Sequence, residues 1–298
     1  MKKQSKHHYV PVFYLKAWTG TNGKLLTNIR DEGIVEKAID QVAWLPYYNK
    51  FCTLSSAEVR TLLELVRNLG LPLGIARRMY ELPRWPKGLA ETPERKLGFE
   101  EIIGAIESRF SRLHQKALAG ECIDGNDERS FSVIVSYLFL QHYRTPAYEK
   151  ELLNAAGNLD AESKDSLLRI TKYARFLLAC SDADIAVLER SEWSVGILRC
   201  RNDAEFITGD APVVCVPNED VRERFYLPLS RNKALVLEHR QESITKPVVL
   251  TNGAVDELNR SVARQCEKYI FAGSKALLER YGFDGELRCY NVKERGDG

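Results

Sequence analysis

Apolar residues change their spacing twice along the chain, and these changes divide it into three regions. Near the N-terminus, short apolar runs alternate with turn dipeptides such as Asn22-Gly23 and Glu32-Gly33, which favour a β-hairpin. From about Ser55 the apolar residues recur every three or four positions, which is typical of amphipathic helices. In the last third they run in short continuous or alternating segments that indicate strands, before a helical spacing returns.

Each region predicts specific elements. Helices are expected at 12–18, from 55 onward, near 75–81, and at 93–119, 126–148, 163–180, 254–272 and 275–281. Strands are expected at 25–30, 34–38, 192–200, 204–210, 213–217, 224–230 and 233–239. Thr145-Pro146 should kink or restart the helix that contains it.

Strands and helices are segregated along the chain, so the predicted fold class is α+β rather than a wound βαβ sheet. Antiparallel strands from the N-terminal hairpin and the C-terminal half are expected to pack with a mainly helical middle region. We expect a single domain over residues 1–298, with a helical insert or subdomain at about 55–190.

Charge and cysteine content narrow the functional classes. The 298 residues include 43 basic and 41 acidic side chains, a net charge of +2, which argues against coating of nucleic acid but leaves room for a local basic groove. The seven cysteines are scattered without zinc-ligand spacing and indicate free thiols in a reducing compartment. The N-terminus lacks the apolar core of a signal peptide, and no apolar stretch approaches the ~20 residues that span a bilayer. We therefore expect a cytoplasmic protein with no membrane partner.

The first candidate for chemistry is His7-His8-Tyr9. Neighbouring residues of an extended segment face opposite ways, so only one of the two histidines can point inward. The apolar run that follows has to be buried, so this N-terminal arm is predicted to dock on the core. The inward histidine could act as a base, phosphate ligand or metal ligand, or the pair could be incidental in an exposed arm.

The second candidate lies on the helix predicted at 126–148. Tyr137, Gln141 and Arg144 continue its apolar line at i, i+4 and i+7, where buried polar groups need partners. Arg144, steadied by Gln141, could present its guanidinium to a phosphate or carboxylate. The alternative is an internal salt bridge with Glu107, Asp210 or another acid.

The third candidate, Asp210, follows a strand that ends at Gly209. A carboxylate in this position can bind a metal or act as acid or base, or it can form an Asx-turn with backbone amides two residues on. Glu100 and Glu101 fit a solvated helix face, whereas Glu107 lies nearer the apolar stripe. Asn259 can point inward from its helix, although a surface amide is the simpler interpretation.

Three segments carry a family resemblance. HHYVPVFYLKAW, LQHYRTP and FITGDAPVV resemble, in this order, the signatures of a bacterial family called domain of unknown function 4238. Gly209 stands where that family usually has Ser, and Val12 stands where a polar residue is common. The resemblance implies no particular activity, and it marks His7, His8, Tyr9, Gln141, Arg144, Thr145 and Asp210.

Two functional hypotheses follow. The sequence contains no phosphate-binding P-loop, dinucleotide-binding glycine motif, zinc-protease motif or nucleophile elbow, which counts against those enzyme classes. The first hypothesis is a hydrolase acting on nucleic acid or a small phosphate-bearing substrate, such as a nuclease that uses a divalent metal. Its candidate catalytic residues are His7, His8 and Asp210, and its candidate substrate-binding residues are Tyr9, Gln141, Arg144 and Thr145.

The alternative is a non-catalytic binding or interaction module. It would be a sensor, or a component of a bacterial phage-defence or toxin system with a protein partner. In it, the same residues form a structural polar network that closes the N-terminal arm onto the domain.

Overall fold

The structure is a computed structural model that describes residues 6–50, 52–68, 99–121, 123–201, 204–217, 223–239, 244 and 246–283. The helix expected near 75–81 and the first residues of the helix expected at 93–119 lie outside these ranges.

The α+β class is confirmed. The helices are α1 Val12–Lys16, α2 Ser56–Asn68, α5 Glu100–Ala119, α6 Glu128–Tyr143, α7 Pro146–Ala155, α8 Ala161–Leu188, α9 Asn252–Gln265 and α10 Lys275–Arg280, with short 3-10 turns η1 Ile39–Gln41 and η3 Arg190–Glu192. The strands are β1 Lys6–His8, β2 Leu25–Ile29, β3 Gly33–Lys37, β4 Trp44–Pro46, β5 Trp193–Arg199, β6 Thr208–Gly209, β7 Val214–Pro217, β8 Glu223–Ser230, β9 Lys233–His239, β10 Val248–Val249 and β11 Tyr269–Phe271. The structure adds three short strands, β1, β4 and β10, where no element was predicted.

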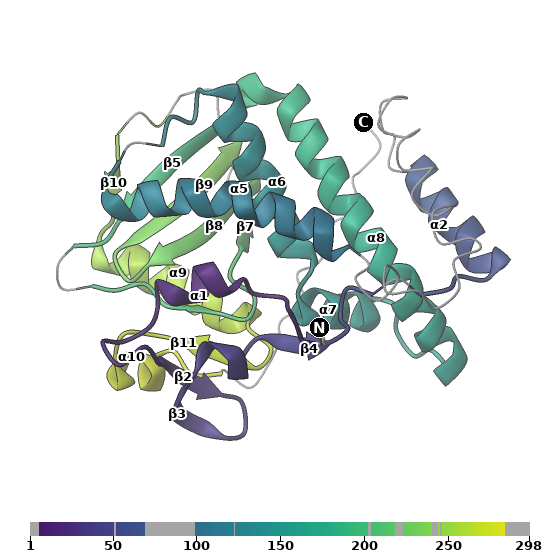
Figure 1. Cartoon of the computed structure of the whole chain (residues 1–298), viewed down its shortest axis with the longest axis horizontal. Helices are drawn as coiled ribbons and strands as arrows, with labels where there is room; N and C mark the ends of the chain where they lie inside the picture. The colour runs from purple at the N-terminus through teal and green to yellow at the C-terminus, as the bar shows by residue number, and fades with distance from the viewer. Residues whose placement is uncertain are drawn as a thin grey trace.

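The strands form a five-stranded sheet, a four-stranded sheet and a two-stranded ladder. The five-stranded sheet has the order β10-β5-β9-β8-β7 and is antiparallel except for the β10–β5 pair. The four-stranded sheet, β3-β2-β11-β6, joins the N-terminal hairpin to strands from the C-terminal half. Figure 1 shows α5 crossing the larger sheet with α6 and α8 beside it, and the smaller sheet lying next to α10.

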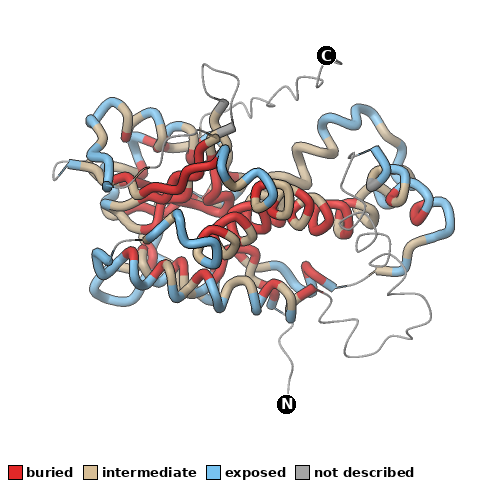
Figure 2. The backbone as a smooth tube through the Cα atoms, turned by 90° about the horizontal axis from the view of Figure 1, so that it is seen from above, coloured by how far each residue is buried: buried red, intermediate tan, exposed pale blue. Residues whose placement is uncertain are grey.

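The core lies between the larger sheet and the central helices. Figure 2 shows buried residues concentrated in the strands and in the middle of the helical region. Tyr14 of α1 is fully buried there, and its hydroxyl lies 2.6 Å from both Thr208 Oγ1 and the Pro228 carbonyl. Because Thr208 belongs to β6 and Pro228 to β8, one side chain of the N-terminal region joins both sheets.

Two helices were predicted with the wrong end points. The helix expected at 126–148 stops at Tyr143, and α7 begins at Pro146 with Thr145 as its N-cap, so the expected restart is confirmed. Proline favours the first position of a helix, where its missing N–H is not needed. The helix expected at 163–180 is longer and spans α8, which Asp160 caps by accepting the Ser163 N–H at 2.8 Å.

The helix expected at 254–272 was also wrong, because its last part is a strand. α9 ends at Gln265, Cys266 is extended, and β11 then pairs with β2 and β6. The Asp210 carboxylate accepts the N–H groups of Glu267 and Lys268, so these amides are not available to continue the helix. A contact with a distant residue therefore overrides the local helical pattern.

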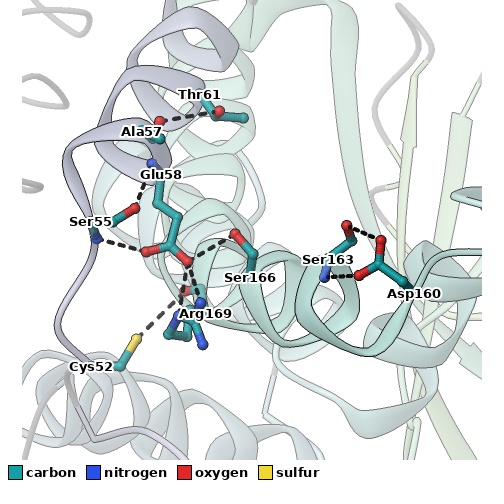
Figure 3. A network of polar contacts seen from close by, with 9 residues as sticks. All are labelled: Cys52, Ser55, Ala57, Glu58, Thr61, Asp160, Ser163, Ser166 and Arg169. Carbon is teal, nitrogen blue, oxygen red and sulfur yellow. Dashed lines mark hydrogen bonds and ion pairs between the residues drawn. The ribbon is translucent and has the colours of Figure 1, made fainter.

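The Glu58 carboxylate links α2 to α8. Glu58 accepts the Ser55 N–H at 2.7 Å and Ser55 Oγ accepts the Glu58 N–H at 3.2 Å, which is a capping box. The same carboxylate accepts hydrogen bonds from Ser166 and Arg169 of α8, both at 2.8 Å (Figure 3). The Ser55 backbone bond and the α8 bonds outweigh the effect of burial and lower the pKa of Glu58 to about 2.

We predict that Glu58→Gln loosens α2. The amide cannot accept all three hydrogen bonds that the carboxylate accepts, and leaving buried groups unpaired costs about 1–3 kcal/mol. Backbone hydrogen exchange in Ser56–Asn68 should therefore accelerate roughly tenfold or more, as measured by mass spectrometry. Glu64→Gln, at an exposed position of the same helix, is the control, and equal exchange in the two variants would contradict the role of Glu58.

Candidate functional site

The candidate residues gather around the N-terminal arm, residues 6–9. β1 pairs antiparallel with β4, and the Tyr9 N–H extends this ladder to the Ala43 carbonyl at 3.0 Å. On either side of β4, Ala43 and Tyr47 adopt left-handed backbone angles, with φ of 51° and 52°. This conformation costs about 1–2 kcal/mol per residue, so the contacts that hold the arm and β4 together must outweigh the strain.

His7 points into the protein and His8 is half-buried, as the alternation of a strand predicts. His7 Nδ1 accepts the Asn49 N–H at 3.1 Å, so the neutral ring carries its proton on Nε2. Glu100 Oε1 lies 3.3 Å from His7 Nδ1 and accepts the Asn49 side-chain amide at 2.5 Å. Burial lowers the pKa of His7, and the charge of Glu100 opposes that shift. Glu100 therefore belongs to the site rather than to a solvated helix face alone.

Arg175 extends this first cluster and was missed in the sequence. Its Nη1 lies 2.6 Å from Glu149 Oε1, and its Nη2 donates to Asn49 Oδ1 at 3.2 Å and to the Tyr48 carbonyl at 3.4 Å. The guanidinium also lies over the Tyr48 ring, 4.3 Å from its centroid. Arg175 falls within the apolar stripe of its helix, and a charge inside such a stripe is the signal that could have identified it.

The second cluster is built on α6. Gln141 Nε2 donates to the Tyr9 carbonyl at 2.9 Å, and Gln141 Oε1 accepts Arg144 Nε at 3.0 Å and Nη2 at 2.6 Å. Arg144 Nη1 lies 2.6 Å from Glu107 Oε1. The internal salt bridge with Glu107, which was the alternative interpretation of Arg144, is therefore observed.

Glu100 and Glu107 share a seven-residue spacing on α5 with His114. Seven residues are about two helical turns, so all three lie on one face, alternating with buried Ile103 and Phe110. The N-terminal segment runs along this face from Glu100 to His114. His7 of the arm lies beside Glu100, and Phe13 of α1 contacts the ring of His114. The spacing is visible in the sequence and could have revealed the role of Glu100.

Asp210 lies directly after β6 and is buried. Its oxygens accept the N–H groups of Glu267 at 2.9 Å and Lys268 at 2.7 Å, and its own N–H binds the Tyr269 carbonyl at 3.0 Å. Burial raises the pKa of Asp210 to about 6, against the lowering effect of these backbone N–H groups. The backbone N–H groups that bind the Asp210 carboxylate belong to residues 57 and 58 positions further along the chain. An Asx-turn would instead use amides two residues on, so the contacts of Asp210 are not those of an Asx-turn.

The space around position 209 explains why a glycine precedes Asp210. A Cβ on Gly209 would collide with Cys266 Sγ and the Tyr269 carbonyl. The buried Cys266 side chain therefore occupies the space that a serine at position 209 would need. Asn259 of α9 also points inward, donating to the Glu205 carbonyl at 2.9 Å and accepting the Ile207 N–H at 3.0 Å, so the surface-amide interpretation does not hold.

Thr145 has a local role as the N-cap of α7. Its hydroxyl accepts the Tyr148 N–H and donates to the His142 carbonyl, both at 3.4 Å. These two contacts orient the turn between α6 and α7.

The arm, Arg144 and Asp210 converge on Tyr9. Gln141 links Arg144 to the Tyr9 carbonyl, and burial followed by the charge of Asp210 raises the pKa of Tyr9. His7, Arg144 and Asp210 are 2%, 2% and 1% exposed. Each of these groups already has a partner in the protein, so the site is closed around the arm.

Among the residues that the structure describes, no group of three or more His, Cys, Asp or Glu side chains is arranged to hold a metal ion. No helix there is both long and apolar enough to cross a membrane.

Fold and site together define an α+β protein whose N-terminal arm is held by two buried arginine networks. The model of the family described as protein of unknown function (DUF4238) matches residues 6–276, so the chain belongs to this family. No curated protein and no solved structure matches the chain.

We predict an asymmetric response to breaking the Arg144–Glu107 pair. Glu107→Gln leaves a buried cation without a counter-charge and should cost about 3 kcal/mol of unfolding free energy. Adding Arg144→Met removes that cation, so the double variant should recover about half of the loss. Urea unfolding measures the free energy of unfolding of each variant. The control is Lys275→Ala, which removes one partner of an exposed ion pair and should change that free energy by less than about 0.5 kcal/mol. Additive losses would show that the two side chains are not coupled.

We also predict that acid destabilises the protein through His142. Burial lowers its pKa to about 4, against the raising effect of a hydrogen bond to the Val213 backbone. The unfolded chain has a pKa near 6.5, so stability present above that pH is lost as the pH falls through 4. This difference corresponds to roughly 3 kcal/mol.

His142→Phe tests this prediction, because phenylalanine keeps an aromatic ring beside Tyr143, Tyr148 and Phe225 but cannot bind a proton. Between pH 7 and pH 4 the variant should lose less unfolding free energy than the parent protein in urea titrations. Other titrating groups are common to both proteins and cancel in the difference. Parallel pH dependences would contradict the assignment to His142.

Proposed function

We propose that this chain is a non-catalytic binding or interaction module, a sensor or a component of a bacterial defence or toxin system, in which the His/Arg/Asp cluster is structural. The observation that carries the proposal is the internal pairing of that cluster. Arg144 binds a glutamate and a glutamine, Asp210 binds two backbone N–H groups, and His7 accepts another.

This pairing favours a structural role because a catalytic acid, base or ligand must reach its substrate. Groups that are almost fully buried and that bind other groups of the protein hold segments together instead. The held segments also offer a contact for a protein partner. Leu45 of β4 and the adjacent Tyr47 are large side chains exposed to solvent on the strand that pairs with the arm.

The hydrolase hypothesis makes the opposite prediction for the same residues. If the cluster acted on a phosphate-bearing substrate through a divalent metal, its side chains would be selected for chemistry and would contribute little to stability. Stability and metal content therefore distinguish the two proposals.

The test is a set of thermal melts of His7→Ala, Arg144→Ala and Asp210→Asn, with metal analysis of the purified parent protein. We expect each variant to melt at least about 5 °C lower, since each leaves buried groups unpaired, and the parent protein to carry no stoichiometric metal. Lys275→Ala is the surface control. Unchanged melting temperatures together with a bound metal ion would favour the hydrolase.

A further inference from the structure

Three buried polar atoms near the Glu107 carboxylate have no hydrogen-bond partner in the part of the chain that the structure describes. They are His8 Nε2, Tyr137 Oη and Arg144 Nη1. Folded proteins leave few such atoms unpaired, and a group of them at one place indicates bound water, an ion or a ligand.

Arg144 is satisfied on one side only. Its Nε and Nη2 donate to Gln141 Oε1 at 3.0 and 2.6 Å. Its Nη1 lies 2.6 Å from Glu107 Oε1, yet the N–H is not aligned for a hydrogen bond to that oxygen. Glu107 therefore neutralises the charge of Arg144 without satisfying this donor.

Tyr137 is directed to the same place by its packing. It lies on the α6 line that continues to Gln141 and Arg144, and its ring stacks on Phe110 of α5 with centroids 3.8 Å apart. Phe110 is one helical turn beyond Glu107. Burial raises the pKa of the Tyr137 hydroxyl, and the charges of Arg144 and Glu107 both act on it. The hydroxyl is thus a neutral donor in the field of this ion pair.

His8 contributes the third unpaired atom, from the arm. Burial lowers the pKa of His8, while the Ile39 backbone carbonyl faces the ring and the charge of Glu107 acts on it. At neutral pH the ring is uncharged, so its unpaired Nε2 can accept a proton or a hydrogen bond. Helix α6, helix α5 and the arm each contribute to this place.

Glu107 is the one charged member of this group that solvent reaches, with 23% of its side chain exposed against 2% for Arg144. It can turn outward, whereas Arg144 stays buried and then needs another anion. A carboxylate can only accept hydrogen bonds, whereas the unpaired atoms are two donors, on Arg144 and Tyr137, and one acceptor, His8 Nε2. A phosphate monoanion has oxygens for both donors and a hydroxyl that can donate to His8 Nε2, and it binds arginine strongly.

We propose that Glu107 occupies a phosphate-binding site, and that the phosphate group of a small ligand binds Arg144, Tyr137 and His8 by displacing the Glu107 side chain into solvent. The inference rests on the proposed function, because it names the ligand class that the binding module recognises. In the ligand-free protein, the Glu107 carboxylate takes the place of the phosphate and balances the charge of Arg144.

The experiment is anion rescue of Glu107→Ala, which removes the internal competitor. The probe is inorganic phosphate, compared with chloride and acetate at the same ionic strength in thermal melts. At roughly 100 times its Kd, phosphate should raise the melting temperature of Glu107→Ala by about 5 °C over chloride. The parent protein should respond less, because Glu107 competes. Equal responses of the parent protein and the variant, or an equal effect of acetate, would overturn the proposal.

Matched variants separate the site from general effects of salt. Glu101→Ala, on an exposed face of the same helix, should show no additional response to phosphate. Tyr137→Phe added to Glu107→Ala removes one hydroxyl and should weaken phosphate binding several-fold. If Glu107→Ala does not fold, Glu107→Gln replaces it, and calorimetry should give a phosphate Kd at least about tenfold lower than in the parent protein. An unchanged Kd would refute the site.

Failure of the proposed function can be recognised separately. Hydrolysis of a phosphate ester by the parent protein would refute the non-catalytic module while leaving phosphate binding intact. Absence of rescue, combined with the losses of stability expected for a structural network, would refute the phosphate site alone.

Discussion

Arg144 and Arg175 are buried beside the N-terminal arm, and each has to find an anion and hydrogen-bond acceptors away from water. An unpaired charge in such a place costs several kcal/mol, so the surrounding elements are constrained to supply partners. Glu107 of α5 and Glu149 of α7 neutralise the two guanidinium groups. Other donors of the two guanidinium groups reach the arm through Gln141 and Asn49, so the arm docks where both arginines find partners.

Asp210 applies the same principle at the smaller sheet. Its buried carboxylate collects two backbone N–H groups at the end of α9, turning the chain so that β11 can enter the sheet between β2 and β6. That sheet contains strands from both ends of the described chain, so one carboxylate helps to join the N-terminal hairpin to the C-terminal half. Gln141 and Asp210 in this way cross-link segments that are remote in the sequence, whereas Thr145 acts locally.

A closed network of this kind can still bind a ligand if one of its contacts is exchangeable. Glu107 is partly exposed and meets Arg144 without an aligned hydrogen bond. An internal carboxylate that occupies the place of a ligand balances the charge of the buried cation when no ligand is present. Structural closure and recognition of an anion are therefore compatible in one site.

The sequence by itself determined the α+β class, the central helices and the need for Arg144 to be paired, because periodicity and a polar residue on an apolar line are local features. Its partner Glu107 was among the acids considered, whereas Arg175 was not recognised. Only the tertiary structure decided that residues 269–271 form a strand and that Asp210 binds backbone amides 57 and 58 positions away. Such pairings depend on which segments pack together, and no local pattern carries that information.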